Sequence, residues 1–295
     1  MFRTKIIITA ILLSIIGVIS AQAQNGDDVT TVRYLPPQEN LGFENLYYEK
    51  LLRLALEKTI DTHGPYELVP GDEAMSQRDA LKAMIKGEGV DIVHTMTDKT
   101  RERVLLPVRI PLVKGLIGVR LVMINKGDQG MFRNVRDVED LKKYTFGQGY
   151  DWPDTEALKY NDIKVTSAQQ YSDLFTMLEN GVIDGFPRAV FEIYDEIMEH
   201  KDNEFAVADG FYIYYPAAMY FFVQKNTKGA KLHKRLEAGL KEAIEDGSFD
   251  KLFLALNGDH LKRAKLNQRT VIKLKNPLLT DETPLDVEEY WYIDY

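Results

Sequence analysis

The stretch "YELVPGDEAMSQRDALKAMIKGEGVDIVHTM", residues 66–96, decides the fold class because its hydrophobic period changes twice. "YELVP" and "VDIVHTM" are typical of strands, and "SQRDALKAMIKGEG" between them has the apolar spacing of a helix. That helix begins at a capping-box arrangement of Ser76 and Asp79 and stops at Gly87. A strand–helix–strand order predicts a parallel sheet flanked by helices, with ligands at the carboxyl ends of the strands.

The same alternation continues on both sides of this stretch. Upstream, "TVRYLPP" (31–37) predicts a strand and "NLYYEKLLRLALEKT" (45–59) a helix; downstream, "LIGVRLVMIN" (116–125) predicts another strand. The polar, glycine-bearing "KGDQG" that follows is interpreted as the crossover between two lobes. A second α/β series then begins with "DVEDLKKY", "TFGQG", "DWPDTEALKYN", "IKVTS" and "SAQQYSDLFTMLENG".

An internal likeness supports two lobes with one plan. "LKAMIKGEGVDIVHTM" (81–96) and "LFTMLENGVIDGFPR" (174–188) both run helix, glycine, aspartate, strand. The later strand "AAMYFFVQKN" and the two helices after it are expected to return to the first lobe. The tail, 263–295, is too aromatic for a disordered segment and is expected to pack on the outside of a lobe.

The amino terminus has the pattern of a secretory signal. "MFRTK" supplies basic residues, 6–19 is an apolar run, and "AQA" offers small residues for cleavage, so the mature chain is expected to begin near Gln24. The alternative is a retained membrane anchor, which the short run disfavours because a spanning helix needs about 20 apolar residues. The absence of cysteine excludes disulfides, thiolate metal sites and a lipid-modified cysteine. A soluble periplasmic protein fits best.

The charge and the histidine spacing limit which classes of partner and ligand are expected. The net charge is −8, and the isoelectric point near 5.3 argues against nucleic acid and anionic membranes. The histidines have no spacing suggestive of metal ligation, and no cofactor or metal is expected. In this acidic chain, "HTMTDKTRERVLLPVRIPL" (94–112) carries three arginines and a lysine. A basic cluster in an acidic chain is a solvated face, a partner surface or an anion site. This cluster begins at a predicted strand end, where ligands bind in such sheets.

Several segments together resemble the periplasmic solute-binding proteins of family 3, the polar amino acid type. They are "VDIV…T…T…R", "DVEDLKKYTFGQG" and "LEAGLKEAIEDGSFDKLF", and the likeness runs to about residue 262. The resemblance implies an α/β clamshell, each lobe a mostly parallel sheet flanked by helices, with the second lobe inserted in the first and closure by hinge bending. The expected division is a signal peptide at 1–23, lobe 1 at 28–125 and 218–262, lobe 2 at 126–217, and an extension at 263–295.

The resemblance also implies a carboxylate site in the first lobe. Family members bind the ligand's α-carboxylate with a threonine-rich loop and an arginine, and the matching positions are Thr95, Thr97 and Arg101. A guanidinium suits this task because its fork holds both carboxylate oxygens. The family places the arginine three residues after the second threonine and this sequence places it four after, so Arg103 and Arg109 are competitors.

The second lobe departs from the family. Where amino acid binders offer an aspartate for the ligand's ammonium group, counting from Asp184 gives Arg188 and Ala189. An arginine facing Arg101 predicts a ligand with more negative charge, since the two cations repel each other. The alternative is an i,i+4 ion pair between Arg188 and Glu192. Aromatic residues near predicted strand ends are expected to wall the cleft: Tyr34, Tyr150, Trp152 and Tyr215.

The function implied is capture of a small anionic or zwitterionic solute, an amino acid or carboxylate, by a monomeric extracytoplasmic protein. The implied partner is an ABC transporter permease or a membrane receptor. The alternative class is a periplasmic enzyme on the same fold, dehydratase-like, with His94 and Glu192 as acid–base candidates. Binding is favoured because no acid–base pair stands out.

Overall fold

The computed structural model describes residues 29–35, 42–71 and 75–292. The expected signal peptide, 1–23, and the expected mature start at Gln24 lie outside the described residues. Within the described ranges, none of the helices combines the length and the apolar character needed to cross a bilayer.

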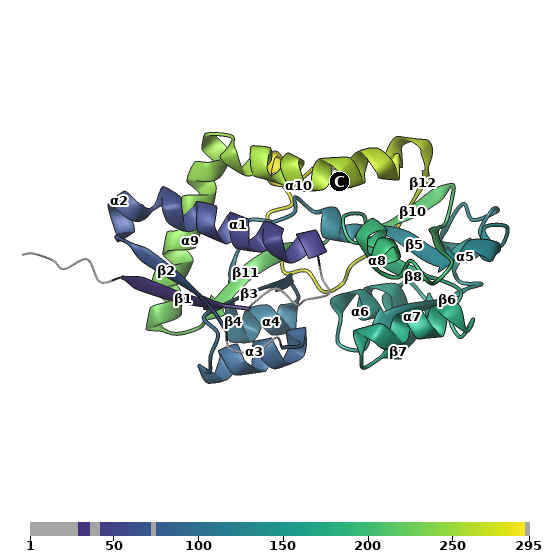
Figure 1. Cartoon of the computed structure of the whole chain (residues 1–295), viewed down its shortest axis with the longest axis horizontal. Helices are drawn as coiled ribbons and strands as arrows, with labels where there is room; N and C mark the ends of the chain where they lie inside the picture. The colour runs from purple at the N-terminus through teal and green to yellow at the C-terminus, as the bar shows by residue number, and fades with distance from the viewer. Residues whose placement is uncertain (1–28, 36–41, 72–74, 293–295) are drawn as a thin grey trace, which may run out of the picture.

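One half of the molecule is built on a five-stranded sheet (Figure 1). Its order is β2-β1-β3-β11-β4; β1 runs parallel to β2 and β3, and β11 runs antiparallel to β3 and β4. The parallel pairing of β1 with β2 and β3 confirms the prediction made from residues 66–96, whereas the expected mostly parallel sheet holds only for these strands, because β11 is antiparallel to both of its neighbours. The strands are β1 (Thr30–Tyr34), β2 (Tyr66–Pro70), β3 (Ile92–Met96), β4 (Leu105–Val108) and β11 (Met219–Gln224).

Helices cover both faces of this sheet. Helices α1 (Gly42–Lys58) and α9 (Thr227–Glu245) share a core with Ile92 and Phe221, whereas α3 (Gln77–Lys86) shares a second apolar cluster with Val93 and Phe222. Neighbouring strand residues therefore serve opposite faces, as the two-residue period of a strand requires.

The ends of α3 follow from local chemistry. The Ser76 side chain accepts a hydrogen bond from the Asp79 backbone N–H at 3.2 Å, and Gly87 closes the helix with φ of 82°. The apolar spacing buries Ala80 and Met84 completely. The predicted start and stop of this helix are confirmed. The predicted apolar face of Ala80, Leu81, Met84 and Ile85 is confirmed only in part, because Ile85 is 53% exposed.

The other half has a sheet of order β12-β10-β5-β8, with β9 also paired to β5. Strand β5 runs antiparallel to β8, β9 and β10, and β12 runs parallel to β10, so the expected mostly parallel sheet is wrong for this half. A parallel pair, β6 and β7, joins this sheet through a bridge between Phe146 and Gly185. The strands are β5 (Val119–Asn125), β6 (Thr145–Gly149), β7 (Lys164–Ala168), β8 (Phe186–Ala189), β9 (Phe205–Val207), β10 (Phe211–Tyr214) and β12 (Thr270–Lys273).

Helices lie beside these strands in the second half, as Figure 1 shows. They are α5 (Val138–Leu141), α6 (Pro153–Tyr160), α7 (Tyr171–Glu179) and α8 (Ile193–Glu199). The stretch α7, Gly181, β8 repeats the order α3, Gly87, β3, and both glycines have positive φ, 67° and 82°. The internal likeness in the sequence thus corresponds to two helix–glycine–strand units.

The expected crossover at "KGDQG" is wrong. Strand β5, which the sequence assigned to the first lobe, pairs entirely within the second sheet, so the chain changes halves between β4 and β5. Residues 126–130 begin with a short 3₁₀ turn, Lys126–Asp128, beyond that change. The error has a physical reason: β5 is buried on both faces and apolar apart from Arg120, and such a run does not specify which sheet receives it.

Helix α10 (Ser248–Ala264) spans the two halves along one edge of Figure 1. It packs against α1 and α9 of the first half. Towards its end, His260 lies 3.7 Å from an Asp195 carboxylate oxygen, and Arg263 lies 4.3 Å from the Tyr194 ring centre, both on α8. The expectation that this helix returns to the first lobe therefore holds only for part of it.

Candidate ligand site

Arg101 lies in α4 (Lys99–Val104), the short helix that begins directly after β3. Asp98 caps this helix, since its side chain accepts hydrogen bonds from the Thr100 and Arg101 backbone N–H groups at 2.7 and 2.8 Å. The guanidinium turns back over the strand end, where Nη1 donates to Thr95 Oγ1 at 2.8 Å and to the Met96 carbonyl at 2.5 Å. The strand end and the cap together hold Arg101 in one orientation.

The same guanidinium reaches the other half. Its Nη2 donates to Gln77 Oε1 at 2.9 Å and to the backbone carbonyl of Asp151 at 3.4 Å, just before α6. Beside it, Arg78 pairs with the Asp151 carboxylate at 3.1 Å and lies 5.3 Å from the Tyr150 ring centre. Arg101 therefore lies at the seam between the halves, only 8% exposed.

The competing arginines do not reach this seam. Arg103 is exposed, and Arg109 pairs with Glu102 at 2.5 Å. Burial lowers the pKa of Arg101, and the carboxylates of Asp98, Asp151 and Asp154 oppose that effect. Arg101 stays cationic, because an ordinary guanidinium pKa lies far above neutrality.

The two predicted threonines have different partners. Thr95 accepts from Arg101, whereas Thr97 donates to Glu102 Oε1 at 2.6 Å. Strand β3 ends at Met96, so the strand alternation no longer governs where Thr97 points. Only Thr95 shares a contact with the predicted anchor.

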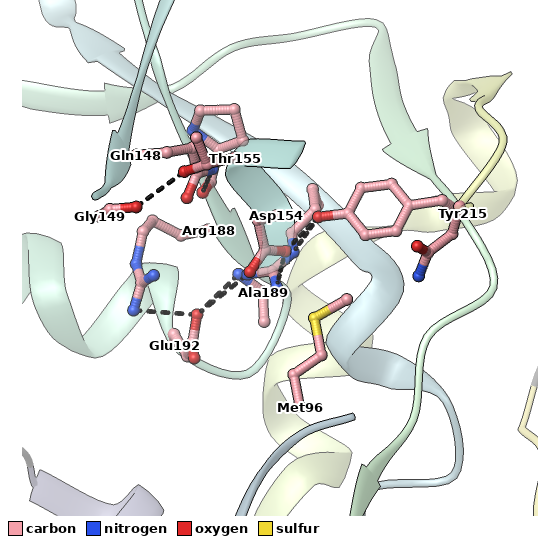
Figure 2. A network of polar contacts seen from close by, with 12 residues as sticks. Met96, Gln148, Gly149, Asp154, Thr155, Arg188, Ala189, Glu192 and Tyr215 are labelled. Carbon is pink, nitrogen blue, oxygen red and sulfur yellow. Dashed lines mark hydrogen bonds and ion pairs between the residues drawn. The ribbon is translucent and has the colours of Figure 1, made fainter. Parts of the chain in front are cut away.

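Arg188 is enclosed within the second half (Figure 2). Its Nε lies 2.8 Å from each Glu196 carboxylate oxygen, and its Nη2 lies 2.5 Å from Glu196 Oε1 and 3.0 Å from Glu192 Oε2. The Arg188–Glu192 pair, held as an alternative from the sequence, is confirmed. Glu196 was missed, although its i,i+4 spacing from Glu192 on the following helix was visible in the sequence.

Aromatic rings complete the enclosure of Arg188. The guanidinium carbon lies 4.9 Å from the Trp152 ring centre, 5.1 Å from Phe186 and 5.6 Å from Tyr171. Burial acts to lower the pKa of Arg188, but the Glu192 and Glu196 carboxylates outweigh it and hold that pKa well above its usual value. Burial raises the pKa of Glu192.

A further buried arginine, Arg120, joins these groups and was not among the predicted site residues. Its Nε donates to Tyr215 Oη at 3.1 Å, its Nη2 donates to Asp154, and its Nη1 lies 3.5 Å from Glu192 Oε2. Tyr215 also donates to Asp154, as Figure 2 shows. A lone charge inside the apolar run "LIGVRLVMIN" was the available signal, since buried arginine needs partners.

The arrangement corrects the argument for an anionic ligand. The buried cations at the seam and behind it are Arg101, Arg120 and Arg188, and their carboxylate partners are Asp98, Asp154, Glu192 and Glu196. The carboxylates outnumber the guanidiniums, so Arg188 is not an unpaired cation facing Arg101. The physical reason for expecting extra negative charge on the ligand therefore disappears.

Of the predicted wall aromatics, three lie near this network and one does not. Trp152 covers Arg188, Tyr215 is fully buried in the Arg120 network, and Tyr150 is 57% exposed at the seam. Tyr34 instead lines a cavity of about 20 Å³ with Tyr48, Glu49 and His94, between sheet and α1. That space holds about one water molecule.

The two acid–base candidates occupy separate clusters. His94 stacks on Tyr48 with ring centres 3.9 Å apart, and burial lowers its pKa to about 4. Glu192 is ion-paired with Arg188 and Arg120 in the second half. Among the described residues, no group of three or more His, Cys, Asp or Glu side chains is placed to hold a metal ion.

Comparisons with known proteins connect this geometry to a fold. No family model and no curated protein matches the chain. Solved structures do: an ancestral arginine-binding protein bound to arginine has a TM-score of 0.54 at 18% identity over 77% of this chain and 97% of that one. The fold is that of the two-lobed periplasmic binding proteins. We call the two halves described above the first and the second lobe.

Further structures with this fold carry similar names. An amino acid ABC transporter substrate-binding protein from Streptococcus pneumoniae, bound to L-arginine, has a TM-score of 0.55 at 13% identity over 78% of this chain and 93% of that one. A putative L-cystine ABC transporter from Listeria monocytogenes has 0.53 at 18% identity, over 77% and 96%. These structures are described as binding or transport proteins. The matches cover nearly the whole length of those proteins but leave part of this chain unmatched.

Proposed function

We propose that this protein is an extracytoplasmic solute-binding protein that captures a small amino acid or carboxylate between its lobes. The observation that carries the proposal is the placement of Arg101 at the seam, bonded to Thr95 on its own lobe and to Asp151 on the other. A guanidinium fork binds a carboxylate through two parallel hydrogen bonds. When the lobes separate, a ligand carboxylate can enter the space between them, and Arg101 is held in position there to bind it.

The charge balance supports a ligand with a single carboxylate. Glu192 and Glu196 already neutralise Arg188, so a zwitterionic amino acid fits as well as a simple acid. To bind it, Arg101 exchanges its contacts with Gln77 and the Asp151 carbonyl for the ligand carboxylate. Hinge opening separates Arg101 from Asp151 and allows this exchange.

The amino-terminal sequence pattern and the fold support a periplasmic site of action and a transporter as the partner. The pattern in residues 1–23 supports export to the periplasm with cleavage near Gln24. The structures with this fold include substrate-binding proteins of amino acid ABC transporters, which supports delivery of the solute to a permease. The protein acts as a monomer in this proposal.

A two-stage experiment tests the proposal. A thermal-shift screen of amino acids, dicarboxylates and sugar acids identifies the ligand, because a ligand of the folded state raises the melting temperature. Calorimetry then compares the parent with Arg101→Ala and with Arg103→Ala, an exposed arginine of the same helix. Arg101→Ala should weaken binding by about 30-fold or more, and Arg103→Ala should leave it unchanged.

Two results contradict the proposal. One is a screen in which no carboxylate stabilises the parent. The other is a folded Arg101→Ala protein that binds the identified solute with the parent's affinity. A larger loss of affinity in Arg103→Ala than in Arg101→Ala would mean that Arg103, and not Arg101, binds the carboxylate.

A further inference from the structure

Residues 274–292, named here the C-terminal strap, run from one lobe to the other. The strap leaves the second lobe at β12, whose Thr270–Lys273 pair with Phe211–Tyr214 of β10. In Figure 1 the yellow chain after β12 passes across the middle of the molecule. Its end lies on the first lobe, where the Tyr292 N–H donates to the Lys114 carbonyl at 2.9 Å.

One set of contacts holds the strap to the second lobe and the segment that leads out of it. Asn161, at the end of α6, donates through Nδ2 to the Lys275 carbonyl at 2.8 Å and accepts from the Lys275 N–H at 3.0 Å. Asn276 Nδ2 donates to the Pro216 carbonyl at 2.9 Å, in the chain between β10 and β11. The reciprocal pair at Lys275 fixes that residue on the second lobe.

A second set holds the strap to α4, the helix that carries Arg101. The Lys99 N–H donates to the Leu278 carbonyl at 3.0 Å, and Lys99 Nζ donates to the Pro277 carbonyl at 2.9 Å. Thr280 Oγ1 donates to Glu102 Oε2 at 3.1 Å. Lys99 opens α4 and Glu102 follows Arg101, so the strap is fixed on both sides of the predicted anchor.

The far end of the strap is packed into the first lobe. Trp291 is 8% exposed and belongs to the apolar cluster that includes Met84 of α3 and Val93 of β3. Its Nε1 donates to the Pro284 carbonyl at 2.7 Å. A buried tryptophan with its N–H satisfied makes this end a firm attachment.

We infer that the C-terminal strap is an intramolecular latch that holds α4 against the second lobe and limits how far the lobes open. Lys275 is fixed to one lobe and Leu278 to the other, and an extended chain covers at most about 3.6 Å per residue. If the lobes separate here by more than the chain from Lys275 to Leu278 can span, the contacts at Asn161 or at Lys99 must therefore break. Release of the strap then controls exchange of solute at Arg101, a consequence that rests on the proposed function.

One substitution removes the Lys99 attachment without disturbing the helix, and it leaves only the Thr280–Glu102 hydrogen bond between the strap and α4. Lys99→Pro deletes both the N–H and the Nζ that bind the strap, and it places proline at the first helical position, where proline is favoured. The preceding Asp98 is already extended, with φ −151° and ψ 162°, as a residue before proline must be. Asn161→Ala independently removes the reciprocal pair with Lys275, while the Leu274 N–H still donates to the Tyr214 carbonyl at 2.7 Å. Lys225→Ala is the matched control because Lys225 Nζ donates to the Arg103 carbonyl and not to the strap.

The separation of the lobes is the measured quantity. The chain has no cysteine, so Lys86→Cys in α3 and Ser172→Cys in α7 place one dye on each lobe for single-molecule energy transfer without added solute. Lys99→Pro should raise the population with separated lobes about threefold or more. Asn161→Ala should raise it by less, because Leu274 still holds the strap to the second lobe one residue earlier. The combination should raise it further than either, while Lys225→Ala matches the parent.

A double variant that folds, by circular dichroism, and has the parent's distance distribution overturns the latch. Lys225→Ala opening the lobes as much as Lys99→Pro also overturns it, because the strap would then not be the cause. The measurement is made without solute, so its failure leaves the solute-binding proposal standing, and the failure of the solute screen leaves the latch standing.

Discussion

Arg101 and Asp151 lie on different lobes, and the Arg101 Nη2 donates to the Asp151 backbone carbonyl at 3.4 Å. The contacts of Arg101 on its own lobe are shorter: 2.8 Å to Thr95, 2.5 Å to Met96 and 2.9 Å to Gln77. Because the inter-lobe bond is the longest of these, it is the weakest by geometry. Arg101 should stay with the first lobe when the lobes separate.

Thr95→Val should weaken solute binding about tenfold, because Arg101 loses the hydroxyl that positions its Nη1. Thr97→Val is the matched control: its hydroxyl serves Glu102, so this change should lower stability with little effect on affinity. Calorimetry with the solute from the screen, together with thermal melts, separates the two effects. An equal loss of affinity in both variants would mean that both threonines contact the ligand, as the sequence suggested.

Arg188→Met should destabilise the protein by about 3–5 kcal/mol at pH 7.5, because buried Glu196 loses its cation and Glu192 keeps only Arg120, which it shares with Asp154. Burial already raises the pKa of Glu192, and the loss of Arg188 raises it further. The folded variant then binds protons more readily than the unfolded chain, whose glutamates have pKa values of about 4.3, so its stability should rise as the pH falls towards 5.

Urea titrations at several pH values measure this effect. Adding Glu192→Gln and Glu196→Gln to Arg188→Met removes the excess charge and should abolish most of the pH dependence. A single variant whose stability loss is the same at pH 5 and pH 7.5 would contradict the interpretation that uncompensated carboxylates cause it.

Tyr215→Phe should cost about 1–3 kcal/mol, because the hydroxyl donates to buried Asp154 and accepts from buried Arg120. Tyr212→Phe, on β10 and partly exposed, is the control and should change stability by less than about 0.5 kcal/mol. Chemical denaturation measures both. Equal values for the two variants would show that the Arg120 network does not depend on the Tyr215 hydroxyl.

His94 should make the protein less stable as the pH falls from about 6.5 to 4. Its pKa is about 4 in the folded protein and 6.5 when unperturbed, so in this window the unfolded chain binds the extra proton. The loss should be about 2 kcal/mol, because the ring is partly exposed. His94→Phe keeps a ring on Tyr48 and should remove this part of the pH dependence, whereas His63→Phe, at an exposed position, should follow the parent curve.

The secondary structure of the first lobe was predictable because its signals are local. Helix α3 begins after Ser76 and ends before Gly87 because of contacts within a few residues, and the apolar spacing between them places Ala80 and Met84 on the buried face. The position of Arg101 was predictable for the same reason, since the end of β3 and the Asp98 cap aim it. The sheet that receives β5 was not predictable, because a strand that is buried on both faces and apolar apart from Arg120 fits either sheet.

The sequence by itself determined the elements, the α/β order and the arginine at the end of β3, because caps, turns and hydrophobic period act over a few residues. Only the tertiary structure decided what the buried arginines bind: Arg120 meets Asp154 and Tyr215, 34 and 95 residues away. The strap was decided in the same way, since Lys275 meets Asn161 across 114 residues. Pairings at such separations depend on which surfaces the folded lobes bring together, and one sequence does not encode them as a local pattern.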